Sequence, residues 1–264
     1  MAWLKRMRRP WVIAAAVVAV LVGTVLATWP LLAKYTGAAG PEQFDHKISL
    51  EPALKPDYRR VLGVAHNAGN NLQTTETALR NGAAVIEIDV KAARGQLAAG
   101  REQWWPWLSE QLFLGPALAE AWDESSQADI TKLDLKQSGR QFLGDLAAFL
   151  NQHAKSRQVM VASRDPGALL YLHRRVRDVT LLFTLAGPDA VQRLESDRAL
   201  EKAVGGVSVF SGLVDPSLIT WLHEHKMEVL AWTVNDGPEF NYLVRLGVNG
   251  ITTDNLAILK ALRD

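Results

Sequence analysis

The chain has 264 residues, 48% of them hydrophobic and 22% charged, which is typical of a globular protein and long enough for one α/β barrel. It contains no cysteine, so disulfides, thiolate catalysis and thiolate metal sites are excluded. Four of the 29 basic residues precede residue 10, and without them 25 basic residues stand against 28 acidic ones, a balance that argues against a nucleic-acid partner because such partners require a basic face.

The N-terminal part has the pattern of a membrane-targeting segment. Residues 1–10 form a basic tail, and residues 11–33 carry no charge and are rich in Ala, Val and Leu. This segment is long enough to cross the roughly 30 Å hydrocarbon core, and the basic tail before it favours a cytoplasmic N-terminus. We expect a single-pass anchor in the cell membrane with the following domain extracytoplasmic; a signal peptide cleaved after Ala27 is the alternative.

Two further regions follow the apolar segment. Residues 34–59 contain three prolines and charges of both signs, which predicts a tether between membrane and domain. Residues 60–264 repeat a pattern of short apolar runs and helical segments, and we interpret them as one domain.

The domain opens with a strand, a helix and a second strand. The apolar run Val61–Ala65 leads directly into His66, and a helix is predicted over Leu72–Arg80. Within the second strand, Ala84–Val90, Glu87 and Asp89 are two residues apart and therefore share one face. Two carboxylates on a buried strand require a nearby positive charge, for which a divalent metal is the favoured candidate and a lysine or arginine the alternative.

Six more strands are expected, each followed by a helical segment. They are predicted over Ile130–Gln137, Val159–Ser163, Val179–Leu185, Gly206–Phe210, Val229–Val234 and Gly250–Thr253. Eight strands alternating with helices predict a (β/α)8 TIM barrel. Together with the apolar segment at 11–33, the predicted architecture is a barrel preceded by one transmembrane helix. A doubly wound open sheet is the alternative, but the first strand is not followed by a Gly-rich dinucleotide loop.

Active sites of such barrels lie at the C-terminal ends of the strands, where this chain places several polar residues. They are His66, Glu87, Asp89, Asp134, Lys136, Ser163, Trp232, Asn235 and Asp254. Three carboxylates with a lysine and a histidine suit a hard cation bound together with a phosphate. Trp232 is expected to line the pocket. A tryptophan-rich segment at 104–107 lies on a loop above the site, either as a lid or aromatic platform or simply packed against the barrel.

These residues resemble the glycerophosphodiester phosphodiesterase family of the PLC-like phosphodiesterase superfamily. The resemblance rests on His66, EID at 87–89, LDLK at 133–136, AWTVN at 231–235 and GVNGITTD at 247–254, and it covers the chain from Val61 onward. It implies Ca²⁺ or Mg²⁺ held by Glu87, Asp89 and Asp134. It further implies a catalytic role for His66 and a phosphate contact for Lys136. We also expect Lys136 and Arg101 to take part in catalysis, and Ser163 and Trp232 to contact the substrate.

The sequence departs from the family pattern at several positions. Asn67 and Ala68 follow His66 where the family has Arg-Gly, and Asp134 stands where a glutamate is usual. Arg101 aligns with the family's second catalytic histidine. Because arginine stays protonated, Arg101 can stabilise or orient a phosphate but is a poor proton donor.

Two functions are therefore considered. The first is a membrane-anchored, metal-dependent phosphodiesterase acting on glycerophosphodiesters or on a related lipid or cell-wall phosphodiester, with a phosphodiester small molecule or a lipid head group as its partner. The second is a catalytically degenerate barrel that binds a phosphorylated ligand or a protein. Arg101 favours the second, whereas the retained carboxylates, His66 and Lys136 favour an enzyme, because a site without chemistry has little reason to keep buried charges.

Overall fold

Short apolar strands alternate with amphipathic helices throughout the part of the chain described by this computed structural model, residues 61–100 and 115–263. The strands are β1 (Leu62–Ala65), β2 (Val85–Ala93), β3 (Gln96–Ala99), β4 (Ile130–Leu135), β5 (Gln158–Ser163), β6 (Thr180–Leu185), β7 (Gly206–Phe210), β8 (Glu228–Trp232) and β9 (Gly250–Thr253). The helices are α2 (Leu72–Arg80), α4 (Leu118–Glu124), α5 (Arg140–His153), α6 (Pro166–His173), α7 (Pro188–Ser196), α8 (Arg198–Ala203), α9 (Pro216–Glu224), α10 (Gly237–Leu246) and α11 (Leu256–Arg263). Single 3₁₀ turns are η1 (Ala68–Asn70), η2 (Ser125–Gln127), η3 (Ala154–Ser156) and η4 (Ser211–Leu213).

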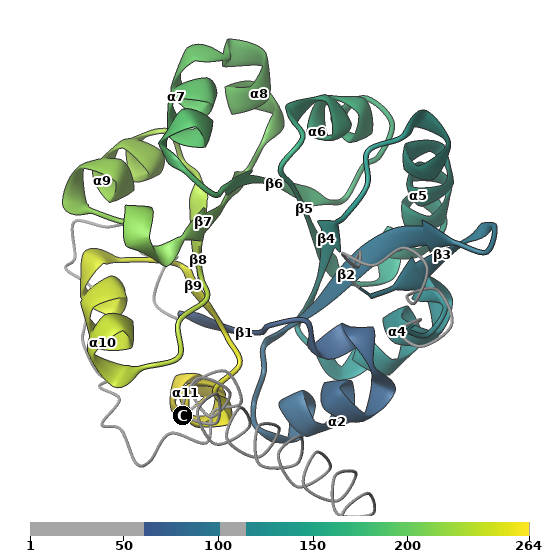
Figure 1. The fold of residues 1–264 in the computed structure, drawn as a ribbon, viewed down its shortest axis with the longest axis horizontal. Helices are drawn as coiled ribbons and strands as arrows, with labels where there is room; N and C mark the ends of the chain where they lie inside the picture. The colour runs from purple at the N-terminus through teal and green to yellow at the C-terminus, as the bar shows by residue number, and fades with distance from the viewer. Residues whose placement is uncertain (1–60, 101–114, 264) are drawn as a thin grey trace, which may run out of the picture. The chain divides into compact units, whose positions relative to one another are not determined.

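The strands close into a barrel with the helices on its outside (Figure 1). The sheet runs in the order β1-β9-β8-β7-β6-β5-β4-β2-β3, and the additional pairing of β1 with β2 closes the ring. Every neighbouring pair is parallel except the β2–β3 hairpin. This arrangement confirms the predicted (β/α)8 barrel and rules out the open sheet.

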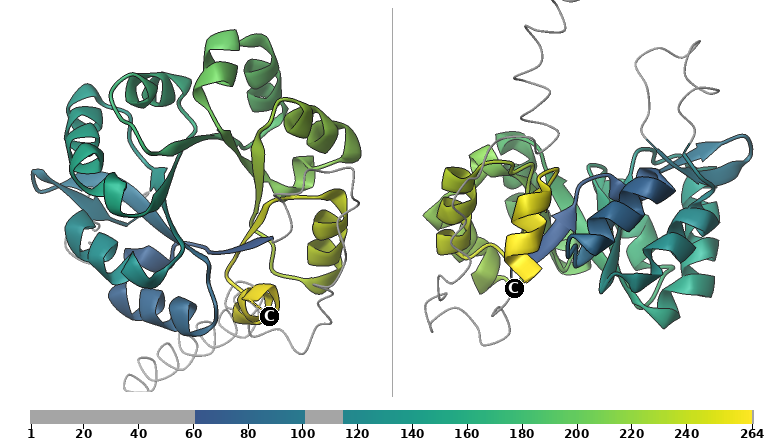
Figure 2. Two further views of the ribbon diagram at one scale, coloured as in Figure 1. Left: turned by 180° about the vertical axis from the view of Figure 1, so that it is seen from behind. Right: turned by 90° about the horizontal axis from the view of Figure 1, so that it is seen from below.

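Alternation along each strand separates the barrel interior from the layer under the helices. On β2, Ile86 and Ile88 pack into the outer core that the helices cover, whereas Val85 belongs to the inner cluster. Glu87 and Asp89 continue the inward-facing series of Val85. The left view of Figure 2 shows the helices surrounding the ring of strands.

Several helices begin with an aspartate followed closely by proline, which fixes the loops at the site end of the barrel. The side chains of Asp165, Asp215 and Asp236 accept hydrogen bonds from backbone N–H groups in the first turns of α6, α9 and α10. Proline stands in the first turn of each of these helices, where its missing N–H costs nothing. These caps hold the strand-to-helix loops in place around the C-terminal ends of the strands.

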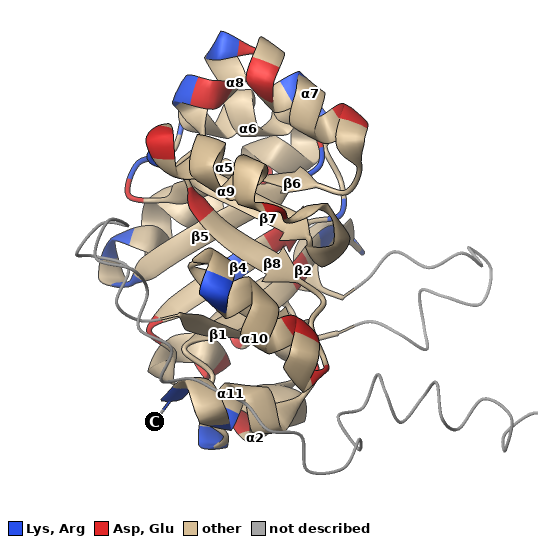
Figure 3. Ribbon diagram, turned by 90° about the vertical axis from the view of Figure 1, so that its left-hand side faces the viewer, with Lys and Arg blue, Asp and Glu red and all other residues tan. Residues whose placement is uncertain are grey.

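Two elements add to the expected pattern, and the outer surface has mixed charge. β3 extends β2 as an antiparallel hairpin where the sequence indicated only a stretch of small residues. Two helices, α7 and α8, connect β6 to β7. Basic and acidic residues are mixed over the outer helices in the side view of Figure 3.

Within the described residues, none of the helices is long and apolar enough to cross a membrane. The predicted basic tail (1–10), membrane anchor (11–33) and tether (34–59) lie outside the described residues, as do Arg101 and the tryptophan-rich segment at 104–107. These five assignments remain predictions from the sequence.

Gly69 is expected to be essential for the close packing of η1 on β2. A Cβ atom at this position would lie 2.3 Å from Cγ1 of Ile88 and 3.1 Å from the carbonyl oxygen of Glu87. We expect Gly69→Ala to lower the free energy of unfolding by about 1–3 kcal/mol, as overpacking does. Chemical denaturation measures this.

Gly144→Ala on α5 is the matched control, because among the described residues its added Cβ meets only the Tyr171 hydroxyl, at 3.8 Å. There the substitution should be neutral or stabilise the helix by up to about 1 kcal/mol. Equal effects of the two substitutions would contradict the packing argument for Gly69.

Candidate functional site

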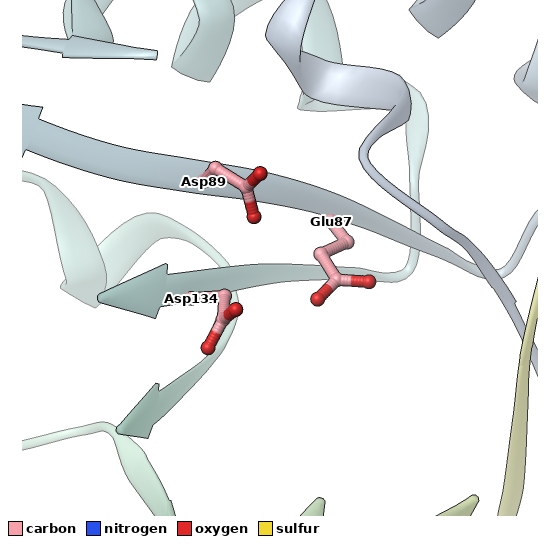
Figure 4. Close-up of side chains that lie close together, drawn as sticks. All are labelled: Glu87, Asp89 and Asp134. Atoms are coloured by element: carbon pink, nitrogen blue, oxygen red, sulfur yellow. The ribbon is translucent and has the colours of Figure 1, made fainter. Parts of the chain in front are cut away.

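Three carboxylates from two adjacent strands meet inside the barrel, at the C-terminal ends of the strands. Glu87 and Asp89 come from β2 and Asp134 from β4, and one carboxylate oxygen of each lies within 4.8 Å of the others (Figure 4). The strand register explains the cluster, because Asp89 and Asp134 are direct partners across the parallel β2–β4 pair. The three residues predicted from the sequence to hold a metal are thus brought together.

Lys136 lies between two of the carboxylates. Its ammonium is 2.9 Å from Oδ1 of Asp89 and also forms an ion pair with Asp134. Burial by itself lowers the pKa of Lys136, but attraction to Asp134 and Asp89 outweighs this and raises the pKa above its ordinary value of 10.5. Lys136 therefore carries a full positive charge beside the carboxylates.

Glu87 lies deeper and has a different partner. Its Oε1 accepts a hydrogen bond of 2.9 Å from the Nζ of Lys132, a lysine that is itself buried. The other oxygen, Oε2, is buried and has no hydrogen-bond partner among the residues that the structure describes. A carboxylate oxygen left in this state is costly unless a ligand completes it.

Asn70 holds Asp89 in place from the loop after β1. The Asn70 side chain donates to Oδ2 of Asp89 over 3.0 Å and accepts from the backbone N–H of Asp89 over 2.8 Å. Asp89 is fully buried, so this two-point contact fixes the carboxylate while leaving its Oδ1 toward Lys136.

His66 follows β1, the neighbour of β2, and contacts a carboxylate of its own. Its Nδ1 lies 2.8 Å from Oδ1 of Asp254, and the Asn67 amide lies 2.9 Å from its Nε2. An aspartate accepts and an amide N–H donates, so these partners assign the proton to Nδ1 and the lone pair to Nε2. The ring is thereby oriented with a basic nitrogen away from Asp254.

Asn235 supports this pair from the loop after β8. Its Oδ1 accepts from the Thr253 hydroxyl and from the backbone N–H of Asp254, and its Nδ2 donates to Oδ2 of Asp254 over 3.2 Å. Both oxygens of Asp254 therefore have partners. This second layer of hydrogen bonds fixes the carboxylate that orients His66.

The opposite side of the barrel mouth is aromatic. Phe210 ends β7 and Trp232 ends β8, and their ring centroids are 5.6 Å apart. The guanidinium of Arg164 lies over the Trp232 ring at 5.9 Å from its centroid. The indole Nε1 of Trp232 is buried and has no partner within the described part of the chain.

The structure does not bring Ser163 to the carboxylate cluster. Ser163 pairs in register with Phe183 and continues the series of Val161, and both of these residues belong to the outer core under the helices. Its hydroxyl accepts a hydrogen bond from the backbone N–H of Asp165, at the start of α6. Alternation from Val159 onward places Ser163 on the outer face, so its observed contact is structural.

Two contributors to the site were not identified from the sequence. Lys132 obeys the same alternation as Asp134 and Lys136, so the pattern KLDLK contained the signal. Asn70 gave no such signal, because its role depends on how η1 folds against β2. Asp254 and Asn235 were placed at the mouth, but their contacts with each other and with His66 emerge only from the structure.

The residues of this site fit a divalent cation. Three carboxylates present oxygens close together, and Glu87 Oε2 is buried without a partner in the described residues. Hard cations such as Ca²⁺ and Mg²⁺ bind such oxygen ligands.

The chain resembles a known family and several solved structures. The model of the Glycerophosphoryl diester phosphodiesterase family matches residues 118–258, more than half of the chain. The match includes Asp134, Lys136 and Asp254 and begins after His66, Glu87 and Asp89. No curated protein sequence matches significantly.

Several solved structures have the same fold at low sequence identity. A phosphodiesterase from Oleispira antarctica, solved with the product sn-glycerol-3-phosphate, is 18% identical, covers 77% of this chain and 96% of its own, and has a TM-score of 0.66. A glycerophosphodiester phosphodiesterase from Thermotoga maritima is 17% identical over 77% of this chain and 98% of its own, with a TM-score of 0.58. A calcium-dependent phosphoinositol-specific phospholipase C from Pseudomonas sp. is 12% identical over 79% and 94%, with a TM-score of 0.54.

The contact between His66 and Asp254 predicts one tautomer of the histidine. We expect ¹⁵N NMR of the ring nitrogens to show the proton on Nδ1 of His66, with the signal assigned by its loss in His66→Ala. Asp254→Ala should move this population toward the Nε2-protonated form, because the acceptor at Nδ1 is removed. Asp145→Ala, at an exposed carboxylate on α5, is the control and should leave the ratio unchanged. An Nε2-protonated ring in the parent would contradict the assignment.

Proposed function

The chain belongs to the glycerophosphoryl diester phosphodiesterase family, and on this basis we propose a membrane-anchored, metal-dependent phosphodiesterase that hydrolyses glycerophosphodiesters or a related lipid or cell-wall phosphodiester. The observation that carries the proposal is the arrangement of a carboxylate-oriented histidine after β1 beside an acidic cluster on β2 and β4. Phosphodiester hydrolysis requires both a base or nucleophile and positive charge near the phosphate.

His66 is proposed as the base or nucleophile of the reaction. With its proton on Nδ1 facing Asp254, it offers the Nε2 lone pair to the substrate. The Asn67 amide contacts Nε2 in the free protein, so substrate binding must replace this contact. Asp254 stabilises the positive charge that develops on the ring when Nε2 takes up a proton or attacks phosphorus.

Glu87, Asp89 and Asp134 are proposed to hold a divalent cation, Ca²⁺ or Mg²⁺. When bound, such an ion supplies positive charge that polarises the phosphoryl oxygens. Lys136 is then free to exchange a carboxylate partner for a phosphate oxygen, since its side chain is 25% exposed and its charge is stabilised by the site. This supports the phosphate-binding role expected for Lys136.

The opposite wall supports a glycerophosphodiester as the substrate class. The Oleispira antarctica phosphodiesterase was solved with sn-glycerol-3-phosphate, which is a product of such a diester. In this chain the buried Trp232 indole N–H has no partner among the described residues, and the Trp232 and Phe210 rings offer an apolar face to the carbon atoms of the alcohol. Trp232 therefore keeps its proposed role in substrate binding.

Arg101 is the observation that favours a second function. Placed where the family has a second histidine, it cannot serve as an ordinary proton donor, and a barrel that binds a phosphorylated ligand or a protein without hydrolysing it would tolerate this change. In the catalytic account Arg101 instead stabilises the charge on the phosphoryl group. Measured turnover decides between the two.

We expect the purified full-length chain, in nonionic detergent, to release glycerol phosphate from glycerophosphodiesters only after a divalent cation is added. Asp134→Asn should reduce kcat on the order of 100-fold or more by weakening the cation site. His66→Ala should reduce kcat by about 10²–10⁴-fold, the usual contribution of a positioned base. Asp145→Asn is the control and should retain activity. Turnover that survives both site substitutions would contradict the assignment; no turnover in the parent would favour the binding function.

The proposed location depends on residues 11–33. We expect the full-length chain to remain with the membrane fraction after alkaline carbonate extraction, because an apolar helix of this length is held by the hydrocarbon core. A chain beginning at residue 40 should be released into the soluble fraction. A full-length protein that is extracted, or that has lost its first 27 residues by mass spectrometry, would replace the anchor with a cleaved signal peptide.

A further inference from the structure

A second lysine, Lys132, is buried inside the barrel. Its side chain is 2% exposed and that of its partner Glu87 is 5% exposed. Lysine is almost never fully buried unless it is paired, because removing an ammonium from water is costly. The pairing with Glu87 must therefore be maintained in the folded protein.

The strand register places Lys132 directly beneath the proposed cation site. Lys132 is the direct partner of Glu87 across β2 and β4, and Asp134 partners Asp89 one inward-facing layer further toward the mouth. The ammonium donates to Glu87 Oε1 over 2.9 Å and to the Ser208 hydroxyl on β7 over 3.4 Å. The lysine thus reaches from β4 to two other strands of the barrel.

The two lysines of the site differ in their freedom to move. The side chain of Lys136 is 25% exposed and lies at the mouth, so it can turn to solvent or to a phosphate when a cation arrives. The side chain of Lys132 is 2% exposed and its ammonium is held by Glu87 and Ser208. A cation held by the three carboxylates would therefore displace Lys136 and coexist with Lys132.

We propose that Lys132 is a fixed internal cation of the site, which limits the affinity for divalent metal and leaves Glu87 a single free oxygen for it. The inference rests on the proposed metal-binding function of the three carboxylates. The positive charge of Lys132 reduces the net charge of the three carboxylates from three negative charges to two, which one divalent ion neutralises. Its hydrogen bond commits Oε1, so that the unpartnered Oε2 is the oxygen presented to the ion.

Electrostatics gives the direction of the effect. A lysine and a divalent ion that share one carboxylate repel each other, and the buried setting screens this repulsion less than water does. Removing the lysine charge should therefore strengthen metal binding. If Lys132 served only to hold Glu87 in position, its removal would instead weaken metal binding, so the sign of the change separates the two roles.

The test is calorimetric titration of metal-free, full-length protein in detergent with Ca²⁺ and with Mg²⁺. Lys132→Met removes the charge and the donor, and Lys132→Gln removes the charge but keeps an N–H donor for Glu87. We expect both variants to bind at least one of the two ions about tenfold or more tightly than the parent. Lys202→Met, at an exposed lysine on α8, is the control for losing one positive charge and should bind like the parent.

Equal or weaker binding in a folded Lys132 variant, or no binding in any protein, would overturn the inference. If Lys132→Met is unfolded by circular dichroism because Glu87 is left unpaired, Lys132→Gln decides. Asp134→Asn, introduced alone, reports separately on the proposed function, since it should abolish the metal binding that the parent shows. A parent that binds no metal together with Lys132 variants that do would support the inference while contradicting metal dependence of the natural protein.

Discussion

The structure depends on compensating three clustered carboxylates on adjacent strands, two of them buried and the third, Asp134, partly buried. Asp89 and Glu87 are almost completely removed from water, and an unpaired charge there would cost several kcal/mol. Two lysines compensate these charges at two depths in the barrel. Lys132 lies deeper and pairs with Glu87, and Lys136 lies nearer the mouth, between Asp89 and Asp134. Of the two carboxylate oxygens of Glu87, Oε1 is bonded to Lys132 and Oε2 has no partner among the described residues.

The barrel converts this arrangement into a directed site. The C-terminal ends of the parallel strands lie at one mouth of the barrel. His66 follows β1, which pairs with β2, so it lies next to the strand that carries Glu87 and Asp89. The β8 and β9 loops reach His66 from the other side, where Asn235 fixes Asp254 and Asp254 fixes the ring. A histidine of defined tautomer, a cluster of carboxylates and an aromatic pair are thereby positioned by the strand ends and the residues that follow them.

Much of this was predictable from the sequence because it depends on local alternation. The EID and KLDLK patterns placed Glu87, Asp89, Asp134 and Lys136 on inward faces, and the repeating strands predicted the barrel. The same alternation, applied fully, would have included Lys132 and excluded Ser163. The hydrogen bonds of Asn70 to Asp89 and of Asn235 to Asp254 join residues 19 positions apart through loop geometry, so no spacing rule predicts them.

The most direct test of the account is to locate a bound metal crystallographically. Crystals grown with Mn²⁺, an oxygen-binding substitute with a strong anomalous signal, should show a peak within about 2.0–2.6 Å of oxygens from Asp89, Asp134 and Glu87. We expect Lys136 to have moved away and Lys132 to remain on Glu87. A site without a peak, with Lys136 still bridging Asp89 and Asp134, would contradict the claim that these carboxylates hold the catalytic cation.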